Sequence, residues 1–411
     1  MKIAMIGQSG GPTAAINASL AGIIEQCQNE NYDSIYGMIN GIKGLMDKNI
    51  MDLKSKFYDE ATYRALSQTP AMYLGSCRFK LPKVEDDEQT YQHIFQVFRE
   101  YKVTDFFYIG GNDSMDTVYK LSEYAKVIDY DIRIIGIPKT IDNDLMGTDH
   151  TPGFGSAAKY VATTMKEIVY DSMIYQLQSI TIVEIMGRNA GWLTAAACLA
   201  RNESNTAPDL IYLPEVPFSK ENFINSIAEV FKHKRGVVIA VSEGIRDENG
   251  QFLDQDSKYA KKDAFGHIIH SGTGKVLETI AFQAFHCKVR SIELNVLQRC
   301  AMHIASKMDI DESIQVGKEA VLAAKRNETG KMVVIKRLFD WPYEKEFKTI
   351  NVSDVANLEQ KVPVHLINEE HNNVTPEMFD YLFPLIQGEV QIEYEYGVPK
   401  YLDVSHLEKE W

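Results

Sequence analysis

The sequence predicts an α/β protein built on doubly wound parallel sheets. Short apolar segments of strand length alternate with longer helical segments along most of the 411 residues. These apolar segments are nearly continuous, which is typical of parallel strands covered by helices on both faces. Polar residues and glycines gather directly after several of them, where open α/β sheets bind ligands.

The elements follow from this pattern in chain order. The strand candidates are Ile3–Ile6, Phe106–Ile109, Ile132–Ile137, Ile180–Ile185, Val237–Val241 and Glu293–Leu297. Segments with helical spacing of apolar residues are Ala18–Cys27, Thr90–Tyr101, Met115–Ala125, Ser156–Val169, Asn222–Phe231, Gly274–Phe285 and Cys300–Met308. Residues 390–396 alternate between apolar and polar side chains, which predicts a half-exposed strand near the C-terminus.

Charge and cysteine usage limit the class of partner. The formal net charge of −14 argues against nucleic acid or an anionic membrane surface as the main partner. The five cysteines form no C-x-x-C pair or regular framework, which is typical of free thiols in a cytoplasmic protein. No apolar run approaches the roughly 20 residues that span a bilayer. The N-terminus runs into a strand pattern without the features of a signal peptide. We therefore expect a cytoplasmic protein.

Two glycine pairs follow strand candidates and precede helices. Gly10-Gly11 lets backbone amides approach an anion at a helix N-terminus, and a tight structural turn is the alternative. Gly110-Gly111 is followed by Asn112 and Asp113, whose oxygen atoms suit a hard cation such as Mg²⁺. Helix capping by Asp113 is the alternative there.

A third polar cluster follows the strand candidate Ile132–Ile137. Lys139 can neutralise phosphate oxygens, and Thr140 can donate a hydrogen bond. Asp142 and Asp144 offer a base and a metal contact, which is what phosphoryl transfer to an alcohol needs. An Asp/Asn-rich turn is the alternative, but a turn does not need the lysine and the paired acids together.

Further charged residues follow later strand candidates. Arg188, within Met186-Gly187-Arg188, can clamp a phosphate with two hydrogen bonds or form a surface salt bridge. Glu243 can accept hydrogen bonds from sugar hydroxyls or serve as a turn acid. Arg290 and Arg299 flank the last strand candidate as phosphate anchors, or are solvated like most arginines.

In order and spacing, these motifs resemble the phosphofructokinase family. The matching segments are Gly10-Gly11-Pro12, Leu74-Gly75-Ser76-x-Arg78, Gly110-Gly111-x-x-Ser114, Pro138-x-Thr140-Ile141-Asp142-Asn143-Asp144 and Met186-Gly187-Arg188. The resemblance covers roughly residues 1–310 and implies two Rossmann-like, doubly wound subdomains. Residues 1–138, completed by a segment at roughly 250–290, would bind the phosphoryl donor, and residues 139–330 the sugar phosphate. Residues 331–411 would form a C-terminal extension packed on the core.

The resemblance also implies the reaction, which is phosphoryl transfer to the 1-hydroxyl of fructose 6-phosphate. Asp142 matches the general base, and Asp144 and Thr140 match its neighbours. Arg188 would also stabilise the charge on the transferring group. The other implied contacts are Met186, Gly187, Arg188 and Glu243 for the sugar phosphate, Arg290 and Arg299 for the 6-phosphate, Gly10 and Arg78 for the donor, and Asn112 with Asp113 for Mg²⁺.

Two charged residues point to pyrophosphate as the donor. ATP-dependent members of the family usually have glycine where this chain has Asp113 and Lys139. A carboxylate at Asp113 would fill the space beside the inner phosphate of the donor and repel a third phosphate. Lys139 would place a cation at the transferring phosphoryl group. The resemblance further implies a homodimer or homotetramer.

Other functions stay open at this stage. An ATP-dependent 6-phosphofructokinase is the nearest alternative. Val296 and Ser179 depart from the family pattern and allow another sugar phosphate, such as sedoheptulose 7-phosphate. A non-catalytic regulatory subunit is disfavoured by intact Asp142, Asp144 and Lys139. A nicotinamide-dependent dehydrogenase is disfavoured because the first loop lacks G-x-G-x-x-G.

Overall fold

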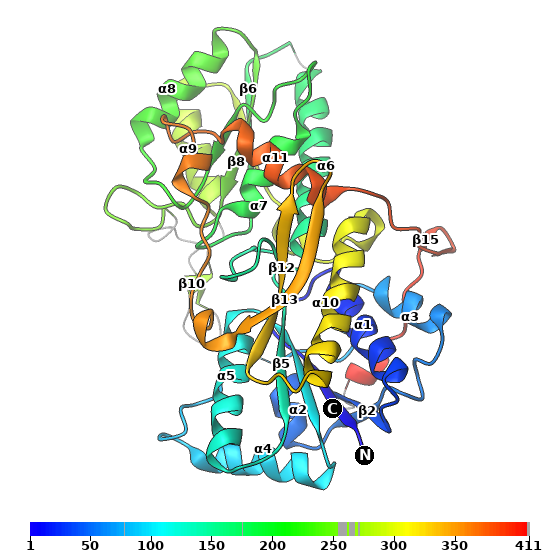
Figure 1. Ribbon diagram of the computed structural model, residues 1–411. Helices are drawn as coiled ribbons and strands as arrows, with labels where there is room; N and C mark the ends of the chain where they lie inside the picture. The colour runs from blue at the N-terminus through cyan, green and yellow to red at the C-terminus, as the bar shows by residue number, and fades with distance from the viewer. Residues whose placement is uncertain (78, 175, 254–260, 263–267, 270–271, 409–411) are drawn as a thin grey trace.

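The protein has two lobes, each built on its own parallel sheet (Figure 1). The computed structural model describes residues 1–77, 79–174, 176–253, 261–262, 268–269 and 272–408. Helices lie on both faces of each sheet, which confirms the predicted doubly wound α/β class.

The first lobe contains a seven-stranded sheet. From edge to edge, its strands are β13 (Glu344–Asn351), β12 (Lys331–Phe339), β5 (Arg133–Pro138), β4 (Asp105–Gly110), β1 (Ile3–Gln8), β2 (Ser34–Met38) and β3 (Ile50–Asp52). The inner strands are parallel, whereas β3 and β13 pair antiparallel at the edges. Every residue of β1 and β4 is buried, which explains their continuous apolar sequences.

Helices cover both faces of this sheet. α1 (Ile16–Asn29) and α10 (Lys307–Lys325) share one core with the sheet. α4 (Glu88–Glu100) and α5 (Asn112–Val127) share the core of the opposite face. Both cores draw alternate residues from the same strands, such as Ile6 for the first and Met5 for the second.

The second lobe contains a four-stranded parallel sheet. Its strands, in spatial order, are β11 (Lys288–Glu293), β6 (Ser179–Ile185), β8 (Gly236–Ser242) and β7 (Leu210–Tyr212). On one face lie α6 (Phe154–Met173), α7 (Trp192–Ala195) and α11 (Pro376–Leu382). On the other face lie α8 (Lys220–Phe231) and α9 (Thr273–Phe285).

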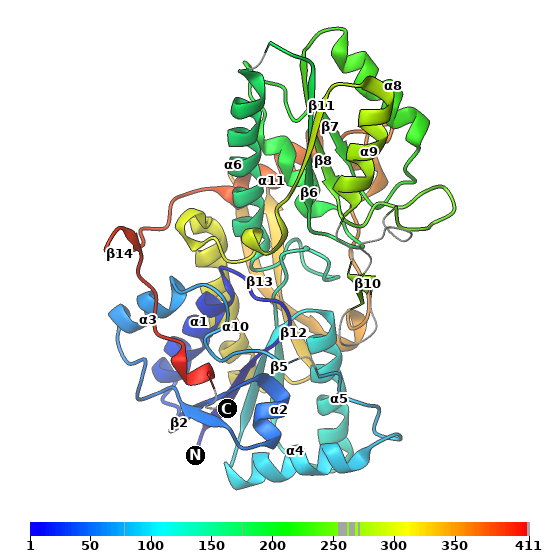
Figure 2. The same cartoon turned by 180° about the vertical axis from the view of Figure 1, so that it is seen from behind.

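Short elements complete the chain. They are α2 (Gly41–Met46), α3 (Glu60–Ser67), β9 (Lys261–Lys262), β10 (Ile268–Ile269), β14 (Tyr394–Glu395) and β15 (Val398–Pro399). The last described residues return to the first lobe, as Figure 2 shows from behind. There Leu402 donates its amide to Thr69 over 3.0 Å, and His406 contacts the carbonyl oxygen of Tyr73 at 2.7 Å.

Three local predictions were wrong. The strand placed at Glu293–Leu297 lies earlier, at Lys288–Glu293, because Asn295 adopts a positive φ of 45° and starts a 3₁₀ turn. The helix placed at Cys300–Met308 begins only at Lys307, where Ser306 accepts a capping hydrogen bond. Of the predicted strand at residues 390–396, only Tyr394–Glu395 forms one, because among the described residues it pairs with the short β15 alone.

The sheet pairing also changes the expected division of the chain. Among the described residues of the 250–290 segment, α9 and the first residues of β11 belong to the second lobe, because β11 pairs with β6. β12 and β13 complete the first sheet instead. The C-terminal extension therefore supplies two strands to one lobe and α11 to the core of the other.

Candidate active site

The glycine turns and the Lys139 loop are joined to one another by main-chain hydrogen bonds. Ser9 donates its amide to Ile109 over 2.9 Å, and Lys139 donates its amide to Gly110 over 3.0 Å. The turns after β1, β4 and β5 therefore lie side by side at the carboxyl edge of the first sheet, as parallel strands require.

Lys139 is the cation at the centre of these turns. Only 3% of its surface is exposed, and its Nζ donates a hydrogen bond to the carbonyl oxygen of Gly11 over 2.8 Å. Burial lowers the pKa of Lys139 to about 8, although Asp142 and Asp144 oppose the shift. Gly10 has a φ of 84°, and a Cβ there would lie 2.9 Å from the Lys139 ammonium. Glycine thus meets both the backbone and the steric requirement at this turn.

Asp142 has the properties of a general base. Its Oδ1 is buried and has no hydrogen-bond partner among the described residues, and its amide donates to the Thr140 hydroxyl over 3.0 Å. Burial, followed by the charge of Asp144, raises the pKa of Asp142 to about 7. The positive charges of Arg299, Lys139 and Arg188 oppose this shift. A carboxylate with a free oxygen and a near-neutral pKa suits proton removal from an alcohol.

Asp144 and Thr140 stand beside this base. Burial raises the pKa of Asp144, and a hydrogen bond from Thr140 acts in the opposite direction. Two neighbouring carboxyl groups with raised pKa values resist being charged together, so they share protons as a pair.

The second lobe contributes the loops after β6 and β8. The Gly187 amide donates to Glu243 Oε1 over 3.3 Å, and the Ser242 hydroxyl donates to the Gly187 carbonyl oxygen over 2.6 Å. Burial, followed by the charge of Asp142, raises the pKa of Glu243 to about 7. The charge of Arg188 opposes that shift, so Arg188, Glu243 and Asp142 share one electrostatic environment. Met186, directly before Gly187, is half-buried.

The predicted metal position lies at the start of α5. Asn112 donates its side-chain amide to Asp144 over 3.4 Å, and its buried Oδ1 has no hydrogen-bond partner in the part of the chain that the structure describes. The Asp113 side chain is 78% exposed and lies 3.9 Å from the Lys80 ammonium. In the part of the chain that the structure describes, no three His, Cys, Asp or Glu side chains form a metal cluster. These oxygens fit Mg²⁺ that takes most of its ligands from phosphate and water.

One predicted contact, Arg290, has no hydrogen bond to the rest of the site among the described residues. Arg290 lies within β11, and its guanidinium pairs with Asp171 of α6 at 3.2 Å. No hydrogen bond of the described residues ties Arg290 to the loops of the site. Arg299, in contrast, acts electrostatically on both Lys139 and Asp142. Arg78 lies outside the described residues.

Sequence reasoning missed a segment of the C-terminal extension that joins the two lobes at the site. Gln360 donates its amide to the Asp144 carbonyl oxygen over 2.8 Å and accepts a hydrogen bond from the Trp192 indole at 3.0 Å. Glu359 accepts from the Asn189 side chain over 2.9 Å, and its charge raises the pKa of Asp144. No motif marks these residues in the sequence, so no local pattern could have found them.

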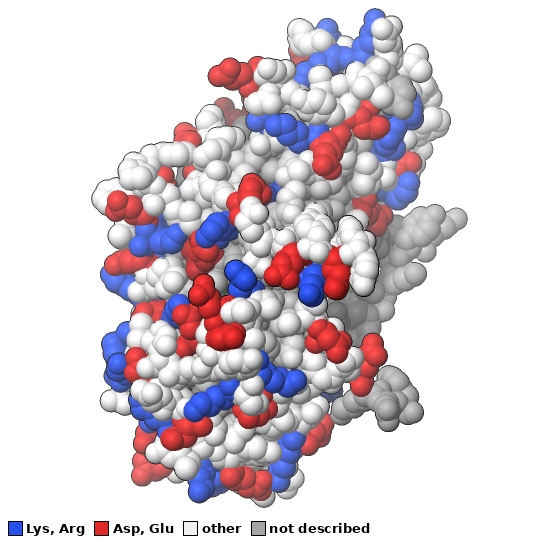
Figure 3. Space-filling model, turned by 90° about the vertical axis from the view of Figure 1, so that its right-hand side faces the viewer, with Lys and Arg blue, Asp and Glu red and all other residues white. Residues whose placement is uncertain are grey.

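The surface of the described residues carries both signs of charge. On the face in Figure 3, lysine and arginine side chains are interspersed with aspartate and glutamate, without an extended area of one sign. Among the described residues, no helix combines the length and apolar character needed to cross a membrane.

Known proteins match the chain over nearly its full length. The phosphofructokinase family model matches residues 2–324. A pyrophosphate–fructose 6-phosphate 1-phosphotransferase of Halomonas elongata is 40% identical over 401 residues, which cover 97% of this chain and 94% of that protein. A sulfofructose kinase of Alkalicoccus urumqiensis is 33% identical over 87% of this chain and 89% of its own.

A solved structure shows the same fold. The pyrophosphate-dependent phosphofructokinase from Nitrosospira multiformis aligns with a TM-score of 0.88 and 34% identity, covering 98% of this chain and 96% of its own. The ordered motifs, the two-lobed fold and these matches together show that the chain belongs to the phosphofructokinase family.

Proposed function

We propose that this protein transfers a phosphoryl group from pyrophosphate to the 1-hydroxyl of fructose 6-phosphate, in a reversible reaction that gives fructose 1,6-bisphosphate. The observation that carries the proposal is the buried Lys139 ammonium, held on the Gly10-Gly11 turn and in the same electrostatic environment as Asp142. The names of the Halomonas and Nitrosospira relatives support the same donor and acceptor.

The acceptor half of the reaction rests on the paired carboxylates. Asp142 takes the proton of the 1-hydroxyl, and its unpaired Oδ1 is the accepting atom. Glu243, Met186, Gly187 and Arg188 hold the sugar, while Arg299 faces the phosphate of the acceptor. Arg290 and Arg78 remain proposed contacts of the two substrates. Positioning and charge neutralisation supply most of the rate in phosphoryl transfer.

The donor half rests on Gly10, Lys139 and the start of α5. Lys139 neutralises charge on the transferring group, and Asp113 occupies the room that the remainder of a nucleotide would need. Asn112 and Asp113 are the residues that would hold Mg²⁺ together with the donor phosphates. When bound, Mg²⁺ neutralises phosphate charge. We also propose a cytoplasmic location and a homodimer or homotetramer.

A donor-by-acceptor activity matrix tests this proposal. The donors are pyrophosphate and ATP, each with Mg²⁺, and the acceptors are fructose 6-phosphate and sedoheptulose 7-phosphate. We expect turnover with pyrophosphate and fructose 6-phosphate and at least ~100-fold less with ATP. Higher kcat/KM with ATP would refute the donor assignment, and higher kcat/KM with the seven-carbon sugar would refute the acceptor assignment.

Removing both charged residues tests the donor assignment directly. Asp113→Gly combined with Lys139→Gly is expected to lower kcat/KM for pyrophosphate by ~100-fold or more, because a preorganised cation is lost. Lys159→Met is the matched control, because Lys159 is also a buried lysine but pairs with Glu389 at 2.9 Å. An equal loss of kcat/KM in the double variant and in Lys159→Met would show that Lys139 acts on folding rather than on the donor.

A further inference from the structure

The buried Asn143 holds the loop that carries both catalytic carboxylates. It stands between Asp142 and Asp144, is fully buried, and adopts a positive φ of 55°. Its Oδ1 accepts the Thr151 amide over 3.0 Å, and its Nδ2 donates to the Tyr381 hydroxyl over 2.8 Å. The backbone at Asn143 therefore fixes how the two flanking carboxylates are directed.

Tyr381 reaches this loop from the C-terminal extension. It lies on α11, 238 residues further along the chain than Asn143. Its hydroxyl accepts from Asn143 and donates to the Asp149 carbonyl oxygen over 2.8 Å, so it is bonded at both ends of the 143–149 loop. Its ring packs at 5.1 Å from the ring of Trp192, which follows the Arg188 loop of the second lobe.

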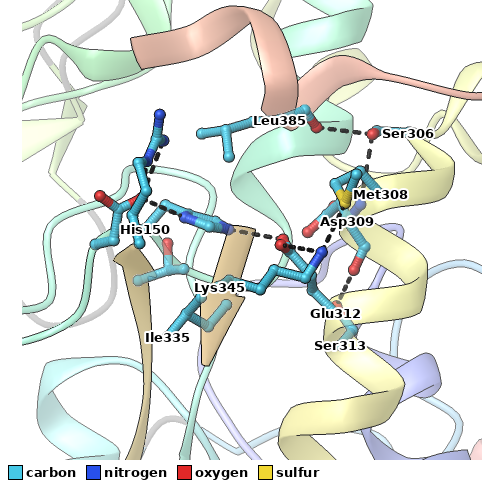
Figure 4. Close-up of polar contacts among 12 residues, drawn as sticks. His150, Ser306, Met308, Asp309, Glu312, Ser313, Ile335, Lys345 and Leu385 are labelled. Atoms are coloured by element: carbon cyan, nitrogen blue, oxygen red, sulfur yellow. Dashed lines mark hydrogen bonds and ion pairs between the residues drawn. The ribbon is translucent and has the colours of Figure 1, made fainter. Parts of the chain in front are cut away.

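A buried charge network fixes Tyr381 in turn. The Arg337 guanidinium lies 4.6 Å from the centre of the Tyr381 ring and donates to its carbonyl oxygen over 3.0 Å. Arg337 also pairs with Asp149 at 3.0 Å, and Asp149 contacts His150 Nδ1 at 2.7 Å. Figure 4 shows the next link, in which His150 and Lys345 both reach Glu312 of α10.

From this geometry, we infer that Tyr381 is a positioning residue for the phosphoryl-transfer reaction, acting on Asp142 and Asp144 through Asn143. Within this network, its hydroxyl is the link from the C-terminal extension to the Asn143 side chain. The extension thereby directs the catalytic loop through Tyr381. The inference rests on the proposed role of Asp142 as the base.

Tyr381→Phe tests the inference with a matched control. The substitution removes only the hydroxyl and keeps the ring against Trp192 and Arg337. Tyr343→Phe removes a hydroxyl from the same network, but that hydroxyl donates to Glu312 over 2.8 Å and not to Asn143. We expect Tyr381→Phe to lower kcat by ~10- to 100-fold with KM within about twofold, because the reacting groups are misplaced. Tyr343→Phe should lose as much thermal stability as Tyr381→Phe but keep kcat within about twofold of the wild-type value.

A double-mutant cycle separates positioning from general stability. Asn143→Gly tolerates the positive φ and removes the side chain. If Tyr381 acts through Asn143, Tyr381→Phe should lower kcat by less than about twofold in the Asn143→Gly background. Equal kcat for Tyr381→Phe and Tyr343→Phe, or fully additive losses in the cycle, would overturn the inference.

Hydrogen exchange tests the same link without activity. Amides of residues 140–145 should exchange at least ~10-fold faster in Tyr381→Phe than in Tyr343→Phe, because the loop loses its anchor. Unchanged exchange would overturn the inference. If the wild-type protein fails to use pyrophosphate and fructose 6-phosphate, the proposed function fails, whereas the exchange measurement still decides whether Tyr381 orders the loop.

Discussion

The Lys139 ammonium lies 2.8 Å from the carbonyl oxygen of Gly11, which joins the turn after β5 to the turn after β1. The protein itself therefore holds the cation in place on the glycine turn. Such preorganisation avoids a rearrangement at the moment when charge moves in the reaction.

The two glycines of the first turn should respond differently to alanine. Gly10→Ala places a side chain at a φ of 84° and 2.9 Å from the Lys139 ammonium, whereas a Cβ at Gly11 meets nothing within 4 Å. We expect Gly10→Ala to lower the free energy of unfolding by ~1–2 kcal/mol. Gly11→Ala should change it by less than about 0.5 kcal/mol. Denaturant unfolding of both variants checks this prediction. An equal loss of unfolding free energy in the two variants would contradict the difference between the two glycine positions.

Removal of the proposed general base should separate catalysis from binding. Asp142→Ala deletes the carboxylate whose buried Oδ1 has no hydrogen-bond partner within the described ranges. Loss of a general base costs ~100- to 10,000-fold in turnover, so we expect kcat to fall by that factor. Calorimetric titration with fructose 6-phosphate should still show binding within about tenfold of wild type. Retained turnover would disprove the assignment of the base.

The pH profile of kcat/KM should be a narrow bell. The Asp142–Asp144 pair must lose a proton to act as base, and the pKa of Asp142 is raised to about 7, so activity rises through that pH. Lys139 must keep its proton, and its pKa is lowered to about 8, so activity falls above that pH. Burial and, after it, the charge of Asp144 raise the pKa of Asp142. Asp144→Asn removes this charge, so the acidic limb should move to lower pH. An unmoved limb would contradict this coupling.

The buried histidine should make stability depend on pH. Glu312 and Asp149 raise the pKa of His150 to about 9, against the opposing effect of burial. A group whose pKa is raised in the folded state stabilises the fold in full below its unfolded-state pKa, ~6.5 for histidine. This stabilisation is lost as the pH rises through about 9. Over this pH range, the free energy of unfolding of the wild-type protein should fall by on the order of 3 kcal/mol more than that of His150→Gln. Denaturant unfolding measures this free energy at each pH. If it depends on pH in the same way in both proteins, His150 is not charged in the folded protein.

The C-terminal extension shows most clearly where the sequence stops being informative. β12 and β13 enter the first sheet and α11 enters the second core, yet no motif marks residues 331–411. The exposed residue Glu359 reaches Asn189 across 170 residues. An exposed glutamate in an irregular segment looks the same in sequence whether or not it contacts an active site.

The sequence by itself determined the parallel α/β architecture, the polar clusters after β1, β4 and β5, and the pairing of Lys139 with Asp142 and Asp144 in one loop. These features depend on short-range patterns, because strand burial and glycine turns are written in neighbouring residues. Only the tertiary structure decided that Arg290 pairs with Asp171 and that Tyr381 holds Asn143. Such contacts join residues more than 100 positions apart, so they depend on tertiary packing rather than on any local preference.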